Sequence, residues 1–135
     1  MRRLSKVLGA LALAGLSVAA QAGTPTNARG EEELAKLLAG RVAEKPDSCI
    51  QLRGASTSSR IIDRTAVVFG DGQVIYVNRP SNPQFLRSGD IITFTTSLSQ
   101  LCRVDIVRTL DPATHMQNGV ISLNDFVPYR RVPKG

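Results

Sequence analysis

The hydrophobic pattern is strongest in the middle of the chain, where two runs rich in β-branched residues flank a short turn. The runs are Thr65–Phe69 and Gln73–Val77, and the tripeptide Gly70-Asp71-Gly72 separates them. Glycine and aspartate tolerate the positive φ angles that tight hairpin turns need. Apolar side chains occupy successive positions in both runs, so both faces of each strand are apolar. Because such strands are normally covered on both sides, the pattern predicts a β-hairpin inside a sheet.

A helical pattern precedes this hairpin at Glu31–Ala43. Its apolar residues recur at helical spacing, at Leu34, Leu37, Leu38 and Val42. Acidic residues at its start and basic residues at its end suit the helix dipole. Gly40 weakens the helix by about 1 kcal/mol relative to alanine, and Pro46 terminates the segment. We therefore expect one N-terminal amphipathic helix, preceded by a disordered leader over Gly23–Gly30.

Short strands account for most of the remaining pattern, and polar loops separate them. In the segment Val104–Thr109 we expect Val104 and Ile106 to face inward, and we expect the tail 130–135 to fray. The pattern predicts a mainly β (α+β) fold in a single domain over residues 31–129. Its small antiparallel sheet of six to seven short strands curls into a barrel or a sandwich, with the helix packed on one side. The strands expected besides the hairpin are Ser48–Arg53, Asp90–Thr96 and Val104–Thr109, with one or two terminal strands from Val120–Leu123 and Phe126–Tyr129. The segment Arg60–Ile62 leads into the hairpin.

The first 22 residues have the pattern of a targeting segment. Three basic residues precede the apolar run Val7–Ala20, and Ala20-Gln21-Ala22 matches the small-x-small site of signal peptidase. The apolar run is shorter than the roughly 20 residues that a spanning helix needs. We therefore predict a signal peptide cleaved after Ala22, and a soluble mature protein that begins at Gly23 and is periplasmic or secreted.

The net charge of +6 depends partly on this segment. Without its three basic residues, 14 basic residues remain against 11 acidic ones, which leaves +3. That excess is too small to indicate nucleic acid or an anionic membrane surface as a partner.

The chain contains two cysteines, Cys49 and Cys102. In an oxidising compartment such a pair is most simply a disulfide. A redox or metal site is the alternative, but the sequence has no Cys-x-x-Cys motif, and His115 is the one additional soft ligand.

Several short motifs lie between Asp47 and Tyr129, namely Cys49-Ile50, Asp63-Arg64-Thr65, Tyr76-Val77-Asn78, Leu101-Cys102 and Phe126-Val127-Pro128-Tyr129. Together they resemble a family of uncharacterised proteobacterial exported domains. Members of that family often carry two further cysteines, near the positions of Phe85 or Leu86 and Ser122 in this chain, so a second disulfide is missing here. The resemblance implies a small β-rich periplasmic domain, and it brings no known activity or catalytic residues.

Candidate catalytic residues are few. A nucleophile–histidine–acid set would have to use His115, which lies in a polar turn and has no Gly-x-Ser-x-Gly motif before it. The sequence shows no phosphate loop, dinucleotide fingerprint, calcium loop or zinc spacing, so we expect no cofactor and no metal. Aspartates are common at turns, where they bond their own backbone. Paired acid–base roles are therefore only an alternative for Asp63, Asp71, Asp90, Asp105 and Asp125.

The loop Asn78–Gly89 is the candidate contact surface, because rigid strands often present binding residues on such loops. Its arginines can grip an anionic group, and its asparagines can both donate and accept hydrogen bonds. The alternative is a plain connector that only blunts a sheet edge. The candidate contact residues are Asn78, Arg79, Asn82, Phe85 and Arg87.

Arginines also flank most of the predicted strands, and arginine makes two-pronged contacts with carboxylates and phosphates. The alternative is a solvated rim that the aspartates balance. The residues in question are Arg53, Arg60, Arg64, Arg79, Arg87, Arg103 and Arg108. Together these features predict an exported, non-catalytic binding or structural module of the bacterial periplasm, with an unknown protein or small-molecule partner in the cell envelope. A small-ligand-binding barrel and a hydrolase of unrecognised type are the alternatives.

Overall fold

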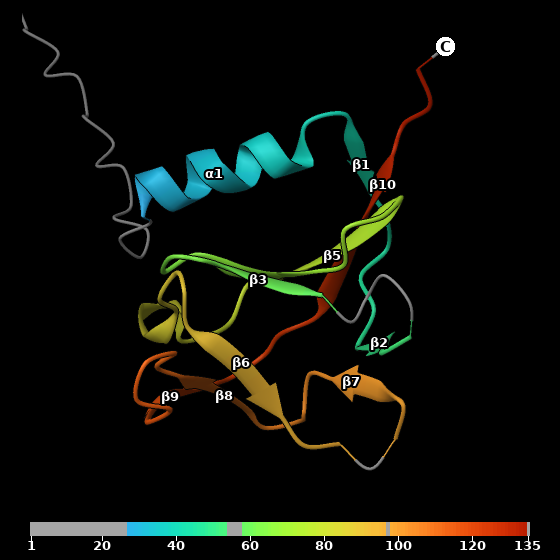
Figure 1. Cartoon of the computed structure of the whole chain (residues 1–135). Coiled ribbons are helices and arrows are strands. Elements are labelled where there is room, and N and C mark those ends of the chain that lie inside the picture. Colours follow the sequence, from blue (N-terminus) through green and yellow to red (C-terminus); the bar gives the residue numbers. More distant parts are fainter. Residues whose placement is uncertain (1–26, 54–57, 97, 135) are drawn as a thin grey trace, which may run out of the picture.

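The computed structural model describes residues 27–53, 58–96 and 98–134. The described residues form one α-helix, one short 3-10 helix and three antiparallel sheets (Figure 1). The five-stranded sheet has the order β1-β10-β5-β4-β3, and it consists of β1 (Arg41–Ala43), β10 (Phe126–Arg131), β5 (Val74–Asn78), β4 (Ala66–Phe69) and β3 (Ser59–Ile62). A three-stranded sheet contains β6 (Ile91–Phe94), β8 (Val107–Leu110) and β9 (Gln117–Ile121), and a two-stranded sheet contains β2 (Cys49–Gln51) and β7 (Gln100–Cys102).

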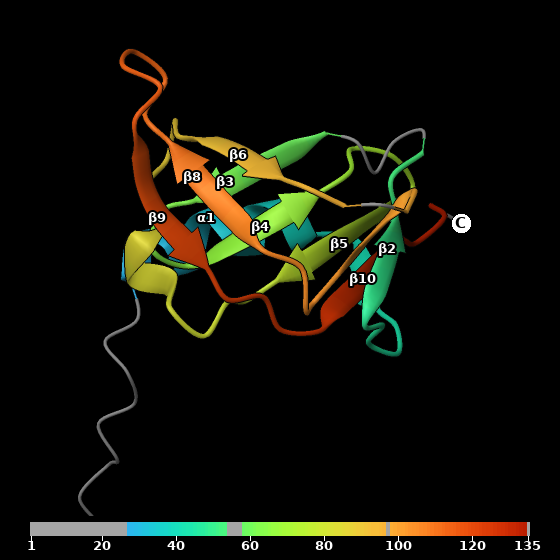
Figure 2. The same ribbon diagram turned by 90° about the horizontal axis from the view of Figure 1, so that it is seen from below.

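The five-stranded sheet is the middle layer of the molecule. Helix α1 (Ala28–Leu38) lies on one of its faces, and β6, β8 and β9 lie across the other (Figures 1 and 2). The described strands form separate sheets, so the arrangement is a sandwich rather than a closed barrel. The predicted mainly β fold with one N-terminal helix is confirmed.

The central hairpin and its place inside the sheet are confirmed. Strands β4 and β5 pair antiparallel, with Phe69 opposite Tyr76, and they occupy interior positions of the sheet. Every residue of β4 is buried, because the strand contributes to two separate cores. The core beneath α1 is built from Leu34, Ile62, Ala66, Val68, Ile75 and Val77. The core on the other face is built from Ile50, Ile61, Val67, Phe69, Leu86, Leu101, Val107, Ile121, Leu123 and Phe126.

The predicted helix boundaries are wrong at both ends. The helix begins at Ala28, inside the segment expected to be a disordered leader, and ends at Leu38. Gly40 has φ +73°, a left-handed conformation that lets the chain reverse after a helix. It is therefore a stop signal, and Arg41–Ala43 leaves the helix and pairs with β10 as strand β1. The leader residues 23–26 lie outside the described residues.

Three further expectations about the strands are wrong. Val104 and Ile106 do not face inward, since they are 82% and 54% exposed and precede β8, which begins at Val107. Arg130 and Arg131 are not a frayed tail but the end of β10, where they pair with β1. The described residues form ten strands rather than six or seven. Strands of three residues, such as β1 and β7, form because they pair with strands that are distant in sequence.

The predicted disulfide between Cys49 and Cys102 is confirmed. The two residues lie directly opposite each other in the pair β2–β7, so the bond fastens two strands of three residues each. Their neighbours Ile50 and Leu101 are buried in the core, which joins this small sheet to the rest of the fold.

Candidate functional site

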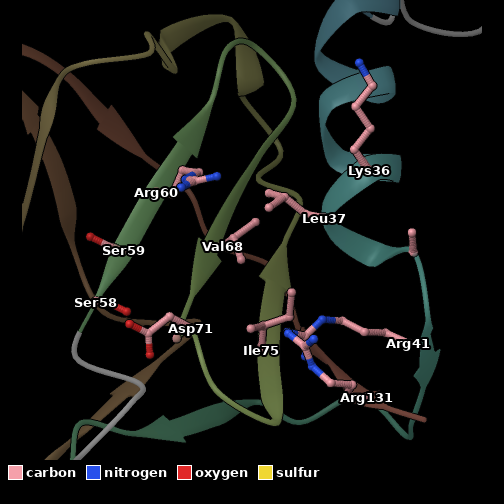
Figure 3. Close-up of a pocket in the computed structure, with 12 residues that line it drawn as sticks. Lys36, Leu37, Arg41, Ser58, Ser59, Arg60, Val68, Asp71, Ile75 and Arg131 are labelled. Carbon is pink, nitrogen blue, oxygen red and sulfur yellow. The ribbon is translucent and has the colours of Figure 1, made fainter. Parts of the chain in front are cut away.

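A groove of about 510 Å³ lies where the C-terminal half of α1 passes over the five-stranded sheet (Figure 3). Val68 and Ile75, both buried, lie on the sheet side, and Leu37 lies on the helix side. We call this hollow the basic groove, because four of its five charged side chains are cations. The cations are Lys36, Arg41, Arg60 and Arg131, and the fifth charged side chain is the carboxylate of Asp71.

Strand pairing brings three of these cations to one face of the sheet. Residues directly opposite in an antiparallel pair point to the same face, and alternate residues along a strand do so too. Arg41 is opposite Arg131 in β1–β10, and Arg131 alternates with Tyr129, which packs on the core beneath α1. Arg60 is opposite Val68 of the same core in β3–β4. The arginines therefore project to the helix side at the two opposite edges of the sheet.

Arg41 is fixed in place by the backbone. Its Nη1 donates to the carbonyl oxygens of Gln73 at 3.0 Å and Tyr129 at 3.4 Å, and its Nη2 donates to that of Gly72 at 3.0 Å. Burial, and secondarily the positive charge of Arg131, lower the pKa of the Arg41 guanidinium. The guanidinium has five N–H donors, so it retains capacity for a further acceptor.

Like charges directly opposite in a sheet destabilise it, and Arg41 and Arg131 are such a pair. Figure 3 shows their guanidinium groups converging beside Ile75. Among the described residues, none of the ion pairs includes Arg41, Arg60 or Arg131. Lys36 is paired with Glu32 at 3.2 Å, and its amino group points away from the arginines. An oxyanion between the two arginines would relieve their repulsion and accept two-pronged hydrogen bonds.

The predicted contact loop is largely engaged within the molecule. Asn78 is fully buried at the end of β5, and not in the loop; its Nδ2 donates to the Asn124 carbonyl at 2.6 Å, and its Oδ1 accepts from the Asn124 amide at 3.1 Å. Asn82 makes a similar clamp, donating to the Val120 carbonyl at 2.7 Å and accepting from the Ser122 amide at 2.9 Å. These asparagines thus hold the connection between β9 and β10.

The other loop residues divide into anchored and exposed ones. Arg79 makes a bidentate contact with Glu31 of α1, at 2.6 and 2.9 Å. Phe85, in the 3-10 helix η2 (Pro83–Phe85), is 44% exposed and lies against Gly119 of β9. The neighbouring Leu86 is the fully buried anchor. Arg87 is exposed. A partner at this loop stays a prediction, and of the five candidate contact residues Arg87 and part of Phe85 are open to one.

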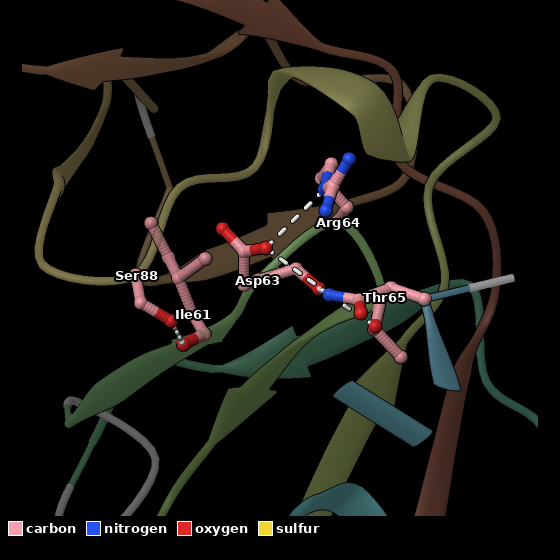
Figure 4. Close-up of polar contacts among 6 residues, drawn as sticks. Ile61, Asp63, Arg64, Thr65 and Ser88 are labelled. Atoms are coloured by element: carbon pink, nitrogen blue, oxygen red, sulfur yellow. Dashed lines mark hydrogen bonds and ion pairs between the residues drawn. The ribbon is translucent and has the colours of Figure 1, made fainter. Parts of the chain in front are cut away.

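A second polar cluster surrounds the turn between β3 and β4 (Figure 4). Asp63 is its centre: its Oδ2 accepts from Asn27 Nδ2 at 3.1 Å and from Arg64 Nε at 3.3 Å, and its carbonyl accepts from Thr65 Oγ1 at 2.8 Å. The turn places Arg64 at φ 46°. The hydrogen bonds from Asn27 to Asp63 connect the start of α1 to the sheet. The polar groups of the cluster bond one another, which is typical of a structural role.

The remaining candidates are dispersed. His115 is exposed at φ 58° in the turn before β9, and no hydrogen bond of the described chain joins its imidazole to a serine or aspartate. Asp111 organises that turn: amide hydrogen bonds from Thr114 and Ala113 lower the pKa of its carboxyl group. Asp105 accepts from the Cys102 amide at 2.7 Å, and Asp90 accepts from Asn118 Nδ2 at 2.9 Å.

The predicted balance of arginines by aspartates holds for two positions, and a glutamate balances a third arginine. Arg64 pairs with Asp63, Arg103 with Asp125, and Arg79 with Glu31. Within the described ranges there is no group of three potential metal-ligating side chains, and no helix there is long and apolar enough to cross a membrane.

Comparison with protein-family models, with curated proteins and with solved structures finds no significant match for this chain. The resemblance to exported proteobacterial domains therefore stays a prediction.

Sequence reasoning singled out Arg60 but missed Arg41 and Arg131 as parts of a site. The sequence pattern placed Arg41 near the C-terminus of the predicted helix, and it placed Arg131 in a basic tail that was expected to fray. The alternation of Val127, Tyr129 and Arg131 could have placed the last residue on the face of its neighbours. Nothing local could have placed Arg41 opposite it, because that pairing joins segments 90 positions apart.

Proposed function

We propose that this protein is an exported, non-catalytic binding module that holds an anionic ligand in the basic groove. The observation that carries the proposal is the facing pair Arg41 and Arg131 at one end of a 510 Å³ hollow, without a carboxylate partner among the described residues. Repulsion between two guanidinium groups held side by side destabilises the free protein, and a bound oxyanion would offset that repulsion.

The chemistry of the lining side chains supports binding rather than turnover. Arginine stays protonated at physiological pH, so it donates hydrogen bonds and does not act as a general base. The groove's carboxylate, Asp71, lies beside Ser58 in the β4–β5 turn (Figure 3), one residue before the Gly72 carbonyl that accepts from Arg41. The groove therefore offers fixed donors and positive charge, which are the features that select an anion.

Export is the second part of the proposal, and the disulfide is compatible with it. If the segment ending at Ala22 is a cleaved signal, the intact mass of the protein from a periplasmic extract will correspond to a chain that begins at Gly23. A mass that retains residues 1–22 would refute the proposed processing.

Anion binding is tested by calorimetric titration of the protein at low salt with pyrophosphate and with citrate. We expect saturable binding that weakens as salt is added, because exposed charges are screened. Arg131→Gln should weaken binding by about tenfold or more, since a hydrogen bond between charged groups contributes about 1.5–3 kcal/mol.

The matched control is Arg108→Gln, which removes the same charge from β8, in the sheet that faces away from α1. It should leave the affinity within about twofold of the wild type, because the charge that is lost lies far from the groove and is screened by solvent. Equal affinity of the wild type and Arg131→Gln, with both proteins folded, would refute the proposed site.

A further inference from the structure

The basic groove has two separate cationic ends. Arg41 and Arg131 form one end, on β1 and β10, and Arg60 forms the other, on β3 at the opposite edge of the sheet. Three strand intervals separate β10 from β3 in the order of the sheet. The pairing register places Arg60 level with Val68, Val77 and Val127, so Arg131 lies four residues further along β10. With neighbouring strands about 4.8 Å apart and about 3.3 Å per residue along a strand, the backbones of Arg131 and Arg60 are roughly 19 Å apart on a diagonal across the sheet.

The surface between the two ends is apolar. Ile75 of β5 and Val68 of β4 occupy the two intervening strands on the helix side, and Leu37 covers them from α1. Figure 3 shows Arg60 and Arg131 pointing inward over this floor. A ligand that contacts both ends must therefore place an uncharged segment between two anionic groups.

The charge at the β3 end is limited. Asp71 shares that end with Ser58 and Ser59, whereas the β10 end has two arginines and no carboxylate lining it among the described residues. A densely charged chain would meet repulsion from Asp71 along its length. A compact anionic group can instead sit on Arg60 and leave Asp71 to solvent.

We infer that the ligand of this groove is a linear dianion, with oxyanionic groups at both ends of an aliphatic spacer. This inference rests on the proposed function. One terminal group binds between Arg41 and Arg131, the spacer crosses Val68 and Ile75, and the second terminal group binds Arg60. After the first group is bound, the second contact is intramolecular, so a spacer of matching length raises the affinity.

The test is a titration series of α,ω-dicarboxylates from succinate through adipate and suberate to dodecanedioate, with octanoate as the monoanion of matched length. Affinity should peak at an intermediate spacer, and the best dicarboxylate should bind about tenfold more tightly than octanoate, as one additional charged hydrogen bond implies. A parallel series of alkane bisphosphonates distinguishes carboxylate from phosphate-type ligands.

Variants separate the two ends. Arg60→Gln should remove most of the affinity advantage of the best dicarboxylate over octanoate, whereas Arg60→Lys should retain most of that advantage. Arg131→Gln should weaken both compounds, and urea unfolding of each variant verifies the fold.

Equal affinity for octanoate and every dicarboxylate in the wild type would overturn the inference. The proposed function would still stand in that case, provided that octanoate binding depends on Arg131. Absence of binding by any anion at low salt would overturn both.

Discussion

Gly30 allows helix α1 to approach the sheet closely, and its replacement by alanine tests that role. An ideal Cβ at this position would lie 2.0 Å from Thr65 Oγ1 and 2.7 Å from the backbone oxygen of Asp63. Cβ atoms essentially never approach other heavy atoms closer than 3.0 Å. The threonine hydroxyl can rotate away, but the carbonyl belongs to the β3–β4 turn, so the helix itself has to withdraw.

Two opposing effects decide the sign of the change. Alanine favours a helix over glycine by about 1 kcal/mol in a helix interior. Overpacking costs about 1–3 kcal/mol, and rotation of the Thr65 hydroxyl gives up its 2.8 Å bond to Asp63, worth about 1 kcal/mol. Withdrawal of the helix also lifts Leu34, which is 1% exposed, from its core. We therefore expect Gly30→Ala to lower the free energy of unfolding by about 1–3 kcal/mol.

Urea unfolding at neutral pH measures this change as a lower midpoint with an unaltered slope. Ala35→Gly, at an exposed position of the same helix, is the matched control for helix propensity and should cost about 1 kcal/mol. Thr65→Ala removes one of the two clashing oxygens, so it should rescue part of the loss in the double variant. If Gly30→Ala instead stabilises the protein by as much as Ala35→Gly destabilises it, a Cβ at Gly30 causes no steric cost and the reasoning is refuted.

Three further predictions concern stability. Thr109 is fully buried, and its hydroxyl has no hydrogen-bond partner in the described chain, so Thr109→Val should raise the unfolding free energy by about 1 kcal/mol in urea titration; a loss would show that the hydroxyl has a partner. The Arg79 hydrogen bond lowers the pKa of Glu31 below its usual 4.5. The pair therefore stabilises the fold above that pH and loses its effect as the pH falls through the lowered pKa. Glu31→Gln should accordingly cost about 0.5 kcal/mol at pH 7 and nothing at pH 2, and a cost that does not change with pH would contradict this. Replacement of both Cys49 and Cys102 by serine opens a loop of 53 positions and should cost about 4 kcal/mol in the chain-entropy estimate, with chemical reduction of the wild type as the comparison; an unchanged urea midpoint would contradict it.

Local patterns in the sequence determined the centre of the fold. The run from Thr65 to Val77 specifies its own turn and shows that both faces are apolar, so a buried hairpin followed without knowledge of the rest of the chain. The two cysteines, in a chain whose first 22 residues have the pattern of an export signal, predicted the disulfide that the structure contains. The hairpin depends only on neighbouring residues, and two cysteines allow only one intramolecular pairing.

The tertiary structure alone decided the candidate site and the boundaries that create it. Gly40 is compatible with a weakened helix or with a helix stop, and pairing of Arg41–Ala43 with β10 selects the stop. That pairing places Arg41 opposite Arg131, just as the folded turn at Asp63 makes Gly30 a packing residue rather than part of a loose leader. Periodicity reports which face of an element a residue occupies. It does not report which distant segment covers that face, because the free energy of that choice comes from contacts between segments far apart in the chain.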